Sequence, residues 1–300
     1  MTALLSLTKA DGQGADVLVI AIEHGRPDLT QRLLYSLDAL WPVVVVRTGH
    51  ASESTDYGGY PCETIDRPDN PGYAEAVNEG LQVGMARGFR FFFVCNNDIV
   101  LEPGTISALR EALIQHPDIG AISPVITFYP DVDRVWFAGG TLWGDMLVTR
   151  HPGYTGAVKK YPSLFPTEFL SACALLVRRE VLDEVGLMPE GYFLYMEDVE
   201  WSLRMRRAGW TLAVFGQPLV HHVGSASSGG VSGRLLTPLS ARLTARNAWI
   251  VRRRLGLRLV PFLIGQLVVR LPYYLLLSLI YRRTDVALTY LKGVWEGLRW

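Results

Sequence analysis

The sequence predicts an α/β fold with a mostly parallel sheet flanked by helices, followed by a helical C-terminal extension. Short apolar runs alternate with amphipathic stretches over the first half of the chain. Of the 300 residues, 49% are hydrophobic and 19% are charged, which is typical of a globular chain with a sizeable core. The last 60 residues are apolar and basic, unlike the rest.

The first half contains four predicted strands and three predicted helices. In order, these are a strand over 17–22, a helix over 28–40, a strand over 43–46, a helix over 74–86, a strand over 91–94, a helix over 103–116 and a strand that begins at 121. Strands that alternate with helices indicate a parallel sheet built from right-handed crossovers. Ligands of such sheets bind beyond the carboxyl ends of the strands.

The second half is predicted to be less regular. Residues 127–166 are rich in Gly, Pro, Tyr and Trp, which indicates short strands and loops that shape a pocket. A strand over 174–177 leads into a short helix over 179–185, and a further helix over 196–208 ends at Gly209.

The C-terminal extension is predicted to contact a membrane surface. From Ala241 onward there are 11 Lys and Arg residues but two acidic residues, in an apolar and aromatic setting that favours lipid over nucleic acid. Residues 259–281 are long enough to span a bilayer, but a central Arg270 would cost at least ~2.5–3.5 kcal/mol there. We therefore expect helices that lie on the membrane with Arg side chains reaching the headgroups. Ordinary packed or oligomer-forming helices and a spanning helix stay open as alternatives.

The cysteines and the N-terminus favour a cytoplasmic location. Cys62, Cys95 and Cys173 are odd in number, widely spaced and without zinc-ligand spacing, which fits a reducing compartment. The N-terminus lacks a basic start followed by a long apolar run, so we expect no secretion signal. Together with the basic extension, this predicts a protein peripheral on the inner face of the cell membrane.

Two polar motifs of the first half are ambiguous when each is taken alone. Asp98 follows an apolar strand within Asn96-Asn97-Asp98, where its carboxylate could hold a divalent ion that binds a diphosphate. The same residues also suit an ordinary turn. The segment from Asn70 to Asn78 could cap a helix, or could direct Asn78 toward a ligand.

Two motifs of the second half are similarly open. Glu197-Asp198 begins a predicted helix. Asp198 could act there as a general base, or its negative charge could simply interact favourably with the positive end of the helix dipole. Arg204 could pair with either acid or be solvated. His221 and His222 are adjacent, so at most one can face a metal ion if they lie in a strand.

The order and spacing of these motifs resemble glycosyltransferase family 2, the inverting enzymes of the GT-A fold, and most of all its bacterial rhamnosyltransferase-like branch. The resemblance spans about residues 17–228. It is carried by Asn70-Pro-Gly-Tyr-Ala with Asn78, Asn96-Asn-Asp98, residues 169–180, residues 186–193, Glu197-Asp198 with Arg204, Gly209-Trp210 and residues 222–227, with Arg246-Asn247 and Gly293…Gly297 in the extension.

The resemblance implies a division of the chain and a role for each motif. A GT-A domain over 1–230 would comprise a nucleotide-sugar half (about 15–125) and an acceptor half (about 126–230), and residues 231–300 would form the extension. Asp198 corresponds to the catalytic base, and Glu197 and Arg204 would hold the local geometry. Asp98 and His222, with His221 as the fallback, would bind Mn²⁺ or Mg²⁺. Residues that would contact the donor are Asn70, Gly72, Asn78, Asn96, Asn97, Arg204 and Asp66.

The implied function is inverting, metal-dependent transfer of a hexosyl group in the synthesis of cell-surface polysaccharide. The donor would be a UDP- or dTDP-sugar, with rhamnose among the candidates, and the acceptor would be a hydroxyl of a glycan or lipid-linked glycan. A homo-oligomer and no nucleic-acid partner fit this expectation. The alternatives are a non-catalytic sugar-nucleotide or glycan-binding relative and a nucleotidyltransferase.

Three positions depart from the family pattern. Residues 46–52 lack the acid that usually holds the nucleotide base, and Asp66 is the candidate replacement. Residues 22–26 differ from the usual segment after the first strand. Ala172 stands where a glycine is common, which should narrow the acceptor pocket slightly.

Overall fold

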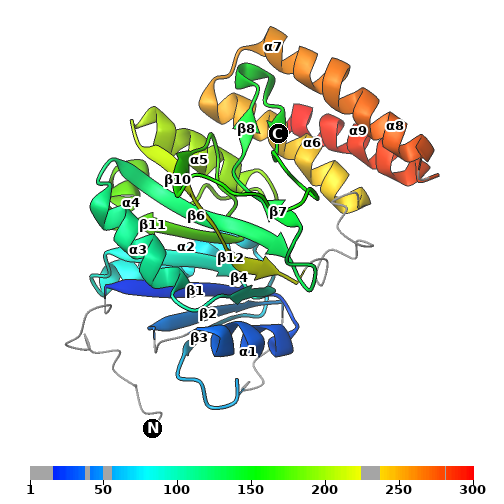
Figure 1. Cartoon of the computed structure of the whole chain (residues 1–300). Helices are drawn as coiled ribbons and strands as arrows, with labels where there is room; N and C mark the ends of the chain where they lie inside the picture. The colour runs from blue at the N-terminus through cyan, green and yellow to red at the C-terminus, as the bar shows by residue number, and fades with distance from the viewer. Residues whose placement is uncertain (1–15, 38–40, 50–55, 224–236, 281) are drawn as a thin grey trace.

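The computed structural model describes residues 16–37, 41–49, 56–223, 237–280 and 282–300. Figure 1 shows a twisted central sheet with helices packed on it and a group of C-terminal helices at one side. The main sheet has the order β10-β12-β6-β11-β4-β1-β2-β3, with β5 paired to β12 and β7 paired to β6.

The elements follow the predicted alternation closely in the first half. The strands of the main sheet are β1 (Val17–Glu23), β2 (Val43–Thr48), β3 (Glu63–Arg67), β4 (Phe91–Asn96), β5 (Ile99–Leu101), β6 (Ile119–Phe128), β7 (Val135–Phe137), β10 (Leu164–Pro166), β11 (Ala174–Arg178) and β12 (Thr211–His222). A small hairpin consists of β8 (Thr141–Leu142), the short helix η1 (Gly144–Met146) and β9 (Thr149–Arg150). The helices of the sheet domain are α1 (Pro27–Ser36), α2 (Tyr73–Ala86), α3 (Thr105–Gln115), α4 (Arg179–Val185) and α5 (Glu197–Arg207).

The N-terminal half of the sheet is parallel, as predicted. β1 lies between β2 and β4, and β2 pairs with β3, all in parallel register. Each residue of β1 from Val17 to Ala21 is fully buried, because helices cover both faces of this part of the sheet. The carboxyl ends of these four strands therefore lie along one edge of the sheet.

The C-terminal half of the sheet is mixed. β11 lies antiparallel between β4 and β6, whereas β12 runs parallel to β6. Strand β12 was not predicted, because Gly216 and Pro218 interrupt its apolar run where its pairing with β6 shifts register. This irregular strand carries both histidines to the edge of the sheet where β4 ends.

Helix boundaries differ from the predictions by a few residues. α1 ends at Ser36, and residues 38–40 of the predicted helix lie outside the described residues. α5 ends as expected, since Gly209 follows it with a φ of 98°.

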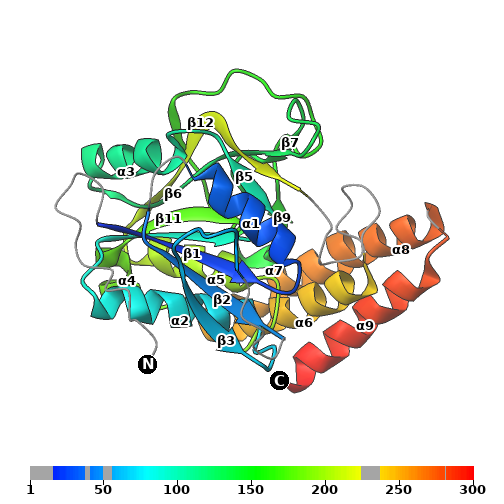
Figure 2. The same ribbon diagram turned by 90° about the horizontal axis from the view of Figure 1, so that it is seen from below.

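The C-terminal extension consists of α6 (Pro238–Leu255), α7 (Leu259–Ile264), the π-helical segment η2 (Gly265–Arg270), α8 (Leu271–Ile280) and α9 (Thr284–Arg299). In Figure 2, α6 and α9 run side by side, with α8 beyond them. The close approach depends on two glycines of α9. A Cβ at Gly293 would lie 2.1 Å from the carbonyl oxygen of Arg242, and one at Gly297 would lie 2.8 Å from that of Arg246.

The residues from α7 to α8 form the one helix of the described chain that could cross a membrane by length and composition. One side of this helix packs on the protein: Gly265 lies against the backbone of Met146, and Gln266 donates to the Met146 carbonyl oxygen at 3.3 Å. Arg270 is only 7% exposed. The prediction that the arginines of this helix reach lipid headgroups is therefore wrong for Arg270, because its side chain turns toward the hairpin β8–β9.

Candidate active site

Asp98 and His222 meet at the carboxyl end of β4. Asp98 follows β4 by two residues and is 5% exposed, and His222 is the last residue of β12. The pairing of β12 with β5 places His222 opposite Ile99, beside Asp98. As a result, Nε2 of His222 lies 3.4 Å from Oδ1 of Asp98.

The strand alternation separates the two histidines. Both ring nitrogens of His221 are engaged, with Thr127 Oγ1 at 2.6 Å and Glu102 Oε1 at 2.7 Å. His222 points the other way, stacks on Trp136 at 4.5 Å, and has no hydrogen-bond partner for Nδ1 among the described residues. His222, not the fallback His221, is the histidine placed to bind a ligand here.

Asp98 and His222 fit two ligands of one divalent ion. Two ligand atoms that each lie about 2.1 Å from one ion are separated by about 3.0–3.4 Å. Oδ1 of Asp98 is buried and has no hydrogen-bond partner among the described residues. Burial raises the pKa of Asp98, but the neighbouring His222 and Asn96 outweigh it and hold the pKa below its usual value. No third His, Cys, Asp or Glu completes a metal cluster in the part of the chain that the structure describes.

The acidic pair Glu197-Asp198 begins α5 after a strained turn. Phe193, Tyr195 and Met196 have φ values of 67°, 71° and 77°. Such conformations of non-glycine residues cost about 1–3 kcal/mol each, and they persist only where surrounding contacts hold them.

Two elements hold this turn. From α6, Asn247 Nδ2 donates to the carbonyl oxygens of Leu194 and Tyr195 at 2.8 Å and 2.7 Å. From α2, the backbone N–H of Tyr73 donates to the carbonyl oxygen of Phe193 at 2.8 Å. The turn is therefore fixed from both sides, which fixes the direction of the two carboxyl groups.

The surroundings act differently on the pKa values of the two acids. Burial raises the pKa of both, and the charge of Asp198 raises that of Glu197 further. Backbone N–H groups of Val199 and Ala172 donate to Asp198 and limit its shift, whereas Oε2 of Glu197 has no hydrogen-bond partner among the described residues. The surroundings therefore stabilise the carboxylate of Asp198 better than that of Glu197, a difference that suits Asp198 as the base.

The segment Ala172–Cys173 joins the two centres. The backbone N–H of Asn96 donates to the carbonyl oxygen of Cys173 at 3.1 Å, while Ala172 donates to Asp198. The Cys173 thiol lies close enough to Asp98 and Asp198 for both charges to raise its pKa, after burial itself. Asp98 and Asp198 therefore face the same edge of the sheet.

Two residues that were predicted to contact the donor, Asn78 and Asn97, have amides with partners inside the protein. Asn78 is 2% exposed. Its side-chain nitrogen donates to the Met188 carbonyl oxygen and to the Glu190 carboxylate, and its side-chain oxygen accepts from the Met188 N–H. Asn97 donates to Thr30 Oγ1 at 3.0 Å. Both amides are thus engaged within the protein: Asn78 ties α2 to the loop after α4, and Asn97 ties the end of β4 to α1.

The other members of the predicted donor site have different surroundings. Gly72 caps α2, and a Cβ there would lie 2.7 Å from Cα of Phe193, so it permits close contact with the strained turn. Asn70 is exposed, and Asn96 is half-buried and donates to Asp98. Asn70 is therefore accessible to a ligand, and Asn96 is partly accessible beside Asp98.

Arg204 does not pair with Glu197 or Asp198. It donates to Glu200, which is fully buried and also accepts from the Tyr192 hydroxyl. Helical spacing of four residues explains the pairing, since residues i and i+4 are neighbours on one face. Arg204 therefore supports the turn before the acidic pair.

The segment that departs from the family pattern begins at the end of β2, and Asp66 of β3 pairs with its arginine. Arg47 lies opposite Asp66 in the parallel register and donates to both its oxygens at 2.5 and 2.7 Å. The predicted residues His50, Ala51 and Ser52 lie outside the described residues. Asp66 is thus at the ligand edge, but as the partner of a buried arginine.

Glu23, at the end of β1, was not among the predicted site residues. It is 5% exposed and accepts from the hydroxyls of Thr30 at 2.5 Å and Tyr57 at 2.8 Å. The sequence feature that could have identified it is an acidic residue at the end of an apolar run. With Arg47 and Asp66, it gives this part of the edge a buried network of charges.

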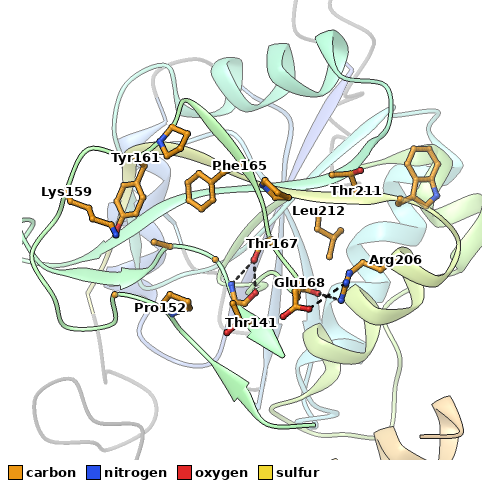
Figure 3. Close-up of a pocket in the computed structure, with 17 residues that line it drawn as sticks. Thr141, Pro152, Lys159, Tyr161, Phe165, Thr167, Glu168, Arg206, Thr211 and Leu212 are labelled. Atoms are coloured by element: carbon orange, nitrogen blue, oxygen red, sulfur yellow. Dashed lines mark hydrogen bonds and ion pairs between the residues drawn. The ribbon is translucent and has the colours of Figure 1, made fainter. Parts of the chain in front are cut away.

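A separate cavity lies elsewhere. It has a volume of about 710 Å³, and Figure 3 shows Tyr161, Phe165 and the ion pair of Glu168 with Arg206 at its wall. No predicted site residue lines it. It adjoins the end of α5 and the start of β12, whereas the acidic pair and His222 lie at the opposite ends of these elements.

Comparisons with known proteins identify the family of this chain. The sequence model of a family described as "Glycosyltransferase like family 2" matches residues 56–250. An N-acetylglucosaminyl-diphospho-decaprenol L-rhamnosyltransferase of Mycobacterium tuberculosis is 31% identical over 241 residues, which is 69% of this chain and 76% of the relative. A low-salt glycan biosynthesis hexosyltransferase of Haloferax volcanii is 23% identical over 64% of this chain and 62% of its own length.

Two solved structures share the fold. A mannosyltransferase from Pyrobaculum calidifontis in complex with GDP-Man and Mn²⁺ has a TM-score of 0.55 at 14% identity, over 94% of this chain and 87% of the other. The structure of GalNAc-T7 with UDP, GalNAc and Mn²⁺ has a TM-score of 0.58 at 15% identity, over 79% of this chain and 47% of the other. This chain thus spans about half of the GalNAc-T7 chain.

Proposed function

The chain belongs to glycosyltransferase family 2 and is a glycosyltransferase with a GT-A-like fold, and from this we propose that it performs inverting, metal-dependent sugar transfer. The donor would be a UDP- or dTDP-sugar, with rhamnose as the leading candidate, and the acceptor a hydroxyl of a lipid-linked glycan in cell-surface polysaccharide synthesis. The observation that carries the proposal is the convergence of Asp98 with His222 and of Asp198 on one sheet edge.

Asp198 would accept the proton of the acceptor hydroxyl as that oxygen attacks the anomeric carbon. Its backbone donors, Val199 and Ala172, orient the carboxylate without neutralising it. Burial and the charge of Asp198 raise the pKa of Glu197, so the site disfavours a second negative charge beside the base. Attack from the face opposite the nucleotide is a single displacement, which inverts the anomeric configuration.

Asp98 and His222 would hold Mn²⁺ or Mg²⁺, which when bound supplies positive charge to the departing diphosphate. Asp98 is suited to this because its carboxylate is buried, ionised and has a free oxygen. Asn96 fixes that carboxylate by donating to it.

We also propose that the extension rests on the cytoplasmic membrane surface. Large apolar side chains of α7 to α9 are exposed, with Val260 at 68%, Val268 at 66%, Leu279 at 75% and Leu288 at 66%. Arginines flank them, including Arg258 with an 81% exposed side chain and Arg283 at 51%. An apolar face with basic borders is the chemistry of a helix that lies in the interface of an anionic bilayer.

Two experiments test these proposals. Nucleotide-sugars should raise the melting temperature only in the presence of Mn²⁺ or Mg²⁺, and the best of them should be hydrolysed slowly. No shift with any UDP-, dTDP- or GDP-sugar would reject the donor assignment. Sedimentation with anionic vesicles should fall for Leu279→Glu but not for Ile114→Glu, an exposed apolar residue of α3.

A further inference from the structure

Arg270 is a buried cation, and no described residue supplies a matching anion. It is 7% exposed and ends the π-helical segment η2. Its Nη2 lies 3.4 Å from the hydroxyl of Thr149, and its Nη1 is buried with no hydrogen-bond partner among the described residues. No carboxylate forms an ion pair with it within the part of the chain that the structure describes.

A buried guanidinium of this kind is suited to bind an anionic ligand. A guanidinium stays protonated in proteins, so it cannot relieve the cost of burial by losing its charge. Buried charges are normally paired, and a buried polar group without a partner requires an explanation. An incoming anion would supply the missing pair, and π-helical segments occur frequently at functional sites.

The position of Arg270 connects the membrane face to the acidic pair. The opposite side of the same helix exposes Val268 and Leu279. On the inner side, Tyr274 is half-buried, and its hydroxyl is close enough to Arg270 for that charge to lower its pKa, although burial raises the pKa by more. Tyr195, in the strained turn, is in turn close to both Tyr274 and Glu197. Arg270 thus lies between the apolar surface and the proposed base.

We propose that Arg270, with the Thr149 hydroxyl, binds a phosphate group of the acceptor, the diphosphate that joins its sugar to its lipid. This rests on the proposed function. The planar fork of a guanidinium pairs with two phosphate oxygens at once, whereas a neutral glycan hydroxyl would leave the charge uncompensated. The acceptor lipid would lie along the exposed apolar face, and its sugar would extend toward Asp198.

The first test measures anion binding without any glycosyl transfer. Inorganic diphosphate, added with EDTA so that no ion occupies the Asp98–His222 site, should raise the melting temperature of the wild-type protein. Arg270→Gln should abolish that shift, and Arg258→Gln, which changes an exposed arginine beside the same helix, should retain it. Equal shifts in Arg270→Gln and wild type would overturn the proposal.

The second test separates acceptor binding from donor chemistry. With a polyprenyl-diphosphate-linked sugar as acceptor, Arg270→Gln should raise KM about 10- to 100-fold, the range for a lost charge-assisted contact. Donor hydrolysis by water should stay unchanged, because it needs no acceptor. Arg270→Lys, which keeps the charge but loses the fork, should lie between. An unchanged KM, or an equal loss of donor hydrolysis, would overturn the assignment.

Vesicles distinguish the two sources of phosphate. The Arg270→Gln variant should sediment with phosphatidylglycerol vesicles as the wild type does, because Arg270 is proposed to bind the acceptor and not the headgroups of the bulk lipid. If the variant lost vesicle binding and kept its acceptor KM, the anion would be a bulk lipid headgroup and the acceptor role would be wrong. If the wild type transferred no sugar, the proposed function would fail, and the diphosphate shift would still report on the anion site.

Discussion

Replacement of Asp198 by asparagine is the most direct test of the proposed chemistry. Asparagine has the same shape and keeps one acceptor oxygen for the Val199 N–H, which lies 2.8 Å from the carboxylate. It cannot accept a proton from the acceptor hydroxyl. General base catalysis contributes about 10²–10⁴ in rate, which corresponds to ~3–5 kcal/mol of transition-state stabilisation.

The structure also predicts how the variant folds. Burial raises the pKa of Asp198, so the native state disfavours its charge. Removal of that charge should therefore leave the melting temperature unchanged or raise it. A loss of activity together with an intact melting temperature would separate catalysis from folding.

The assay is release of nucleotide diphosphate with donor, acceptor and Mn²⁺, at saturating substrates. We expect kcat to fall by at least 10²-fold. Asp183→Asn is the matched control, because Asp183 is an exposed acid of α4 that pairs with Arg179. Turnover of Asp198→Asn above a tenth of the wild-type value would refute its role as the base.

Three further predictions follow from the site and the extension. Activity should decline as the pH falls through about 6, because the base must be ionised and the pKa of Asp198 is raised to about 6; a kcat/KM that is flat from pH 8 to pH 5 would contradict this. His222→Gln should raise the Mn²⁺ concentration for half-maximal donor hydrolysis at least ~10-fold, whereas His221→Gln should not. Gly293→Val should lower the free energy of unfolding by about 1–3 kcal/mol in urea titration, because its side chain would meet a backbone carbonyl of α6, whereas Leu288→Val on the exposed face of α9 should have a small effect.

The parallel half of the fold and the site at its edge could be predicted from local sequence. β1, β2 and β4 are apolar runs bounded by turns, and a polar motif after such a run lies at the carboxyl edge by geometry. The direction of β11 could not be read in this way. An apolar run buried on both faces looks the same for a parallel or antiparallel neighbour, and its partners are distant in sequence.

The orientation of polar side chains was harder to predict than their position. Asn78 lies on the predicted helix, but its amide meets Met188, more than 100 residues further along the chain. Arg204 pairs with Glu200, four residues earlier on the same helix face, and not with the acidic pair; the helical spacing allowed this pairing, but the sequence alone did not select it. The choice between His221 and His222 likewise depended on the register of β12 against β5.

The predicted division of the chain at residues 230 and 231 lies outside the described residues, but contacts across it bear on how the site works. Asn247 of α6 donates to three carbonyl oxygens of the turn from Tyr192 to Tyr195. Those hydrogen bonds offset part of the conformational free-energy cost of the left-handed residues before Glu197. Without α6, the GT-A part of the chain would have to stabilise this turn by itself. The extension is therefore part of the scaffold that aims the proposed base. Since the same extension carries the exposed apolar face, attachment to a membrane would fix the direction of the acidic pair relative to the lipid surface.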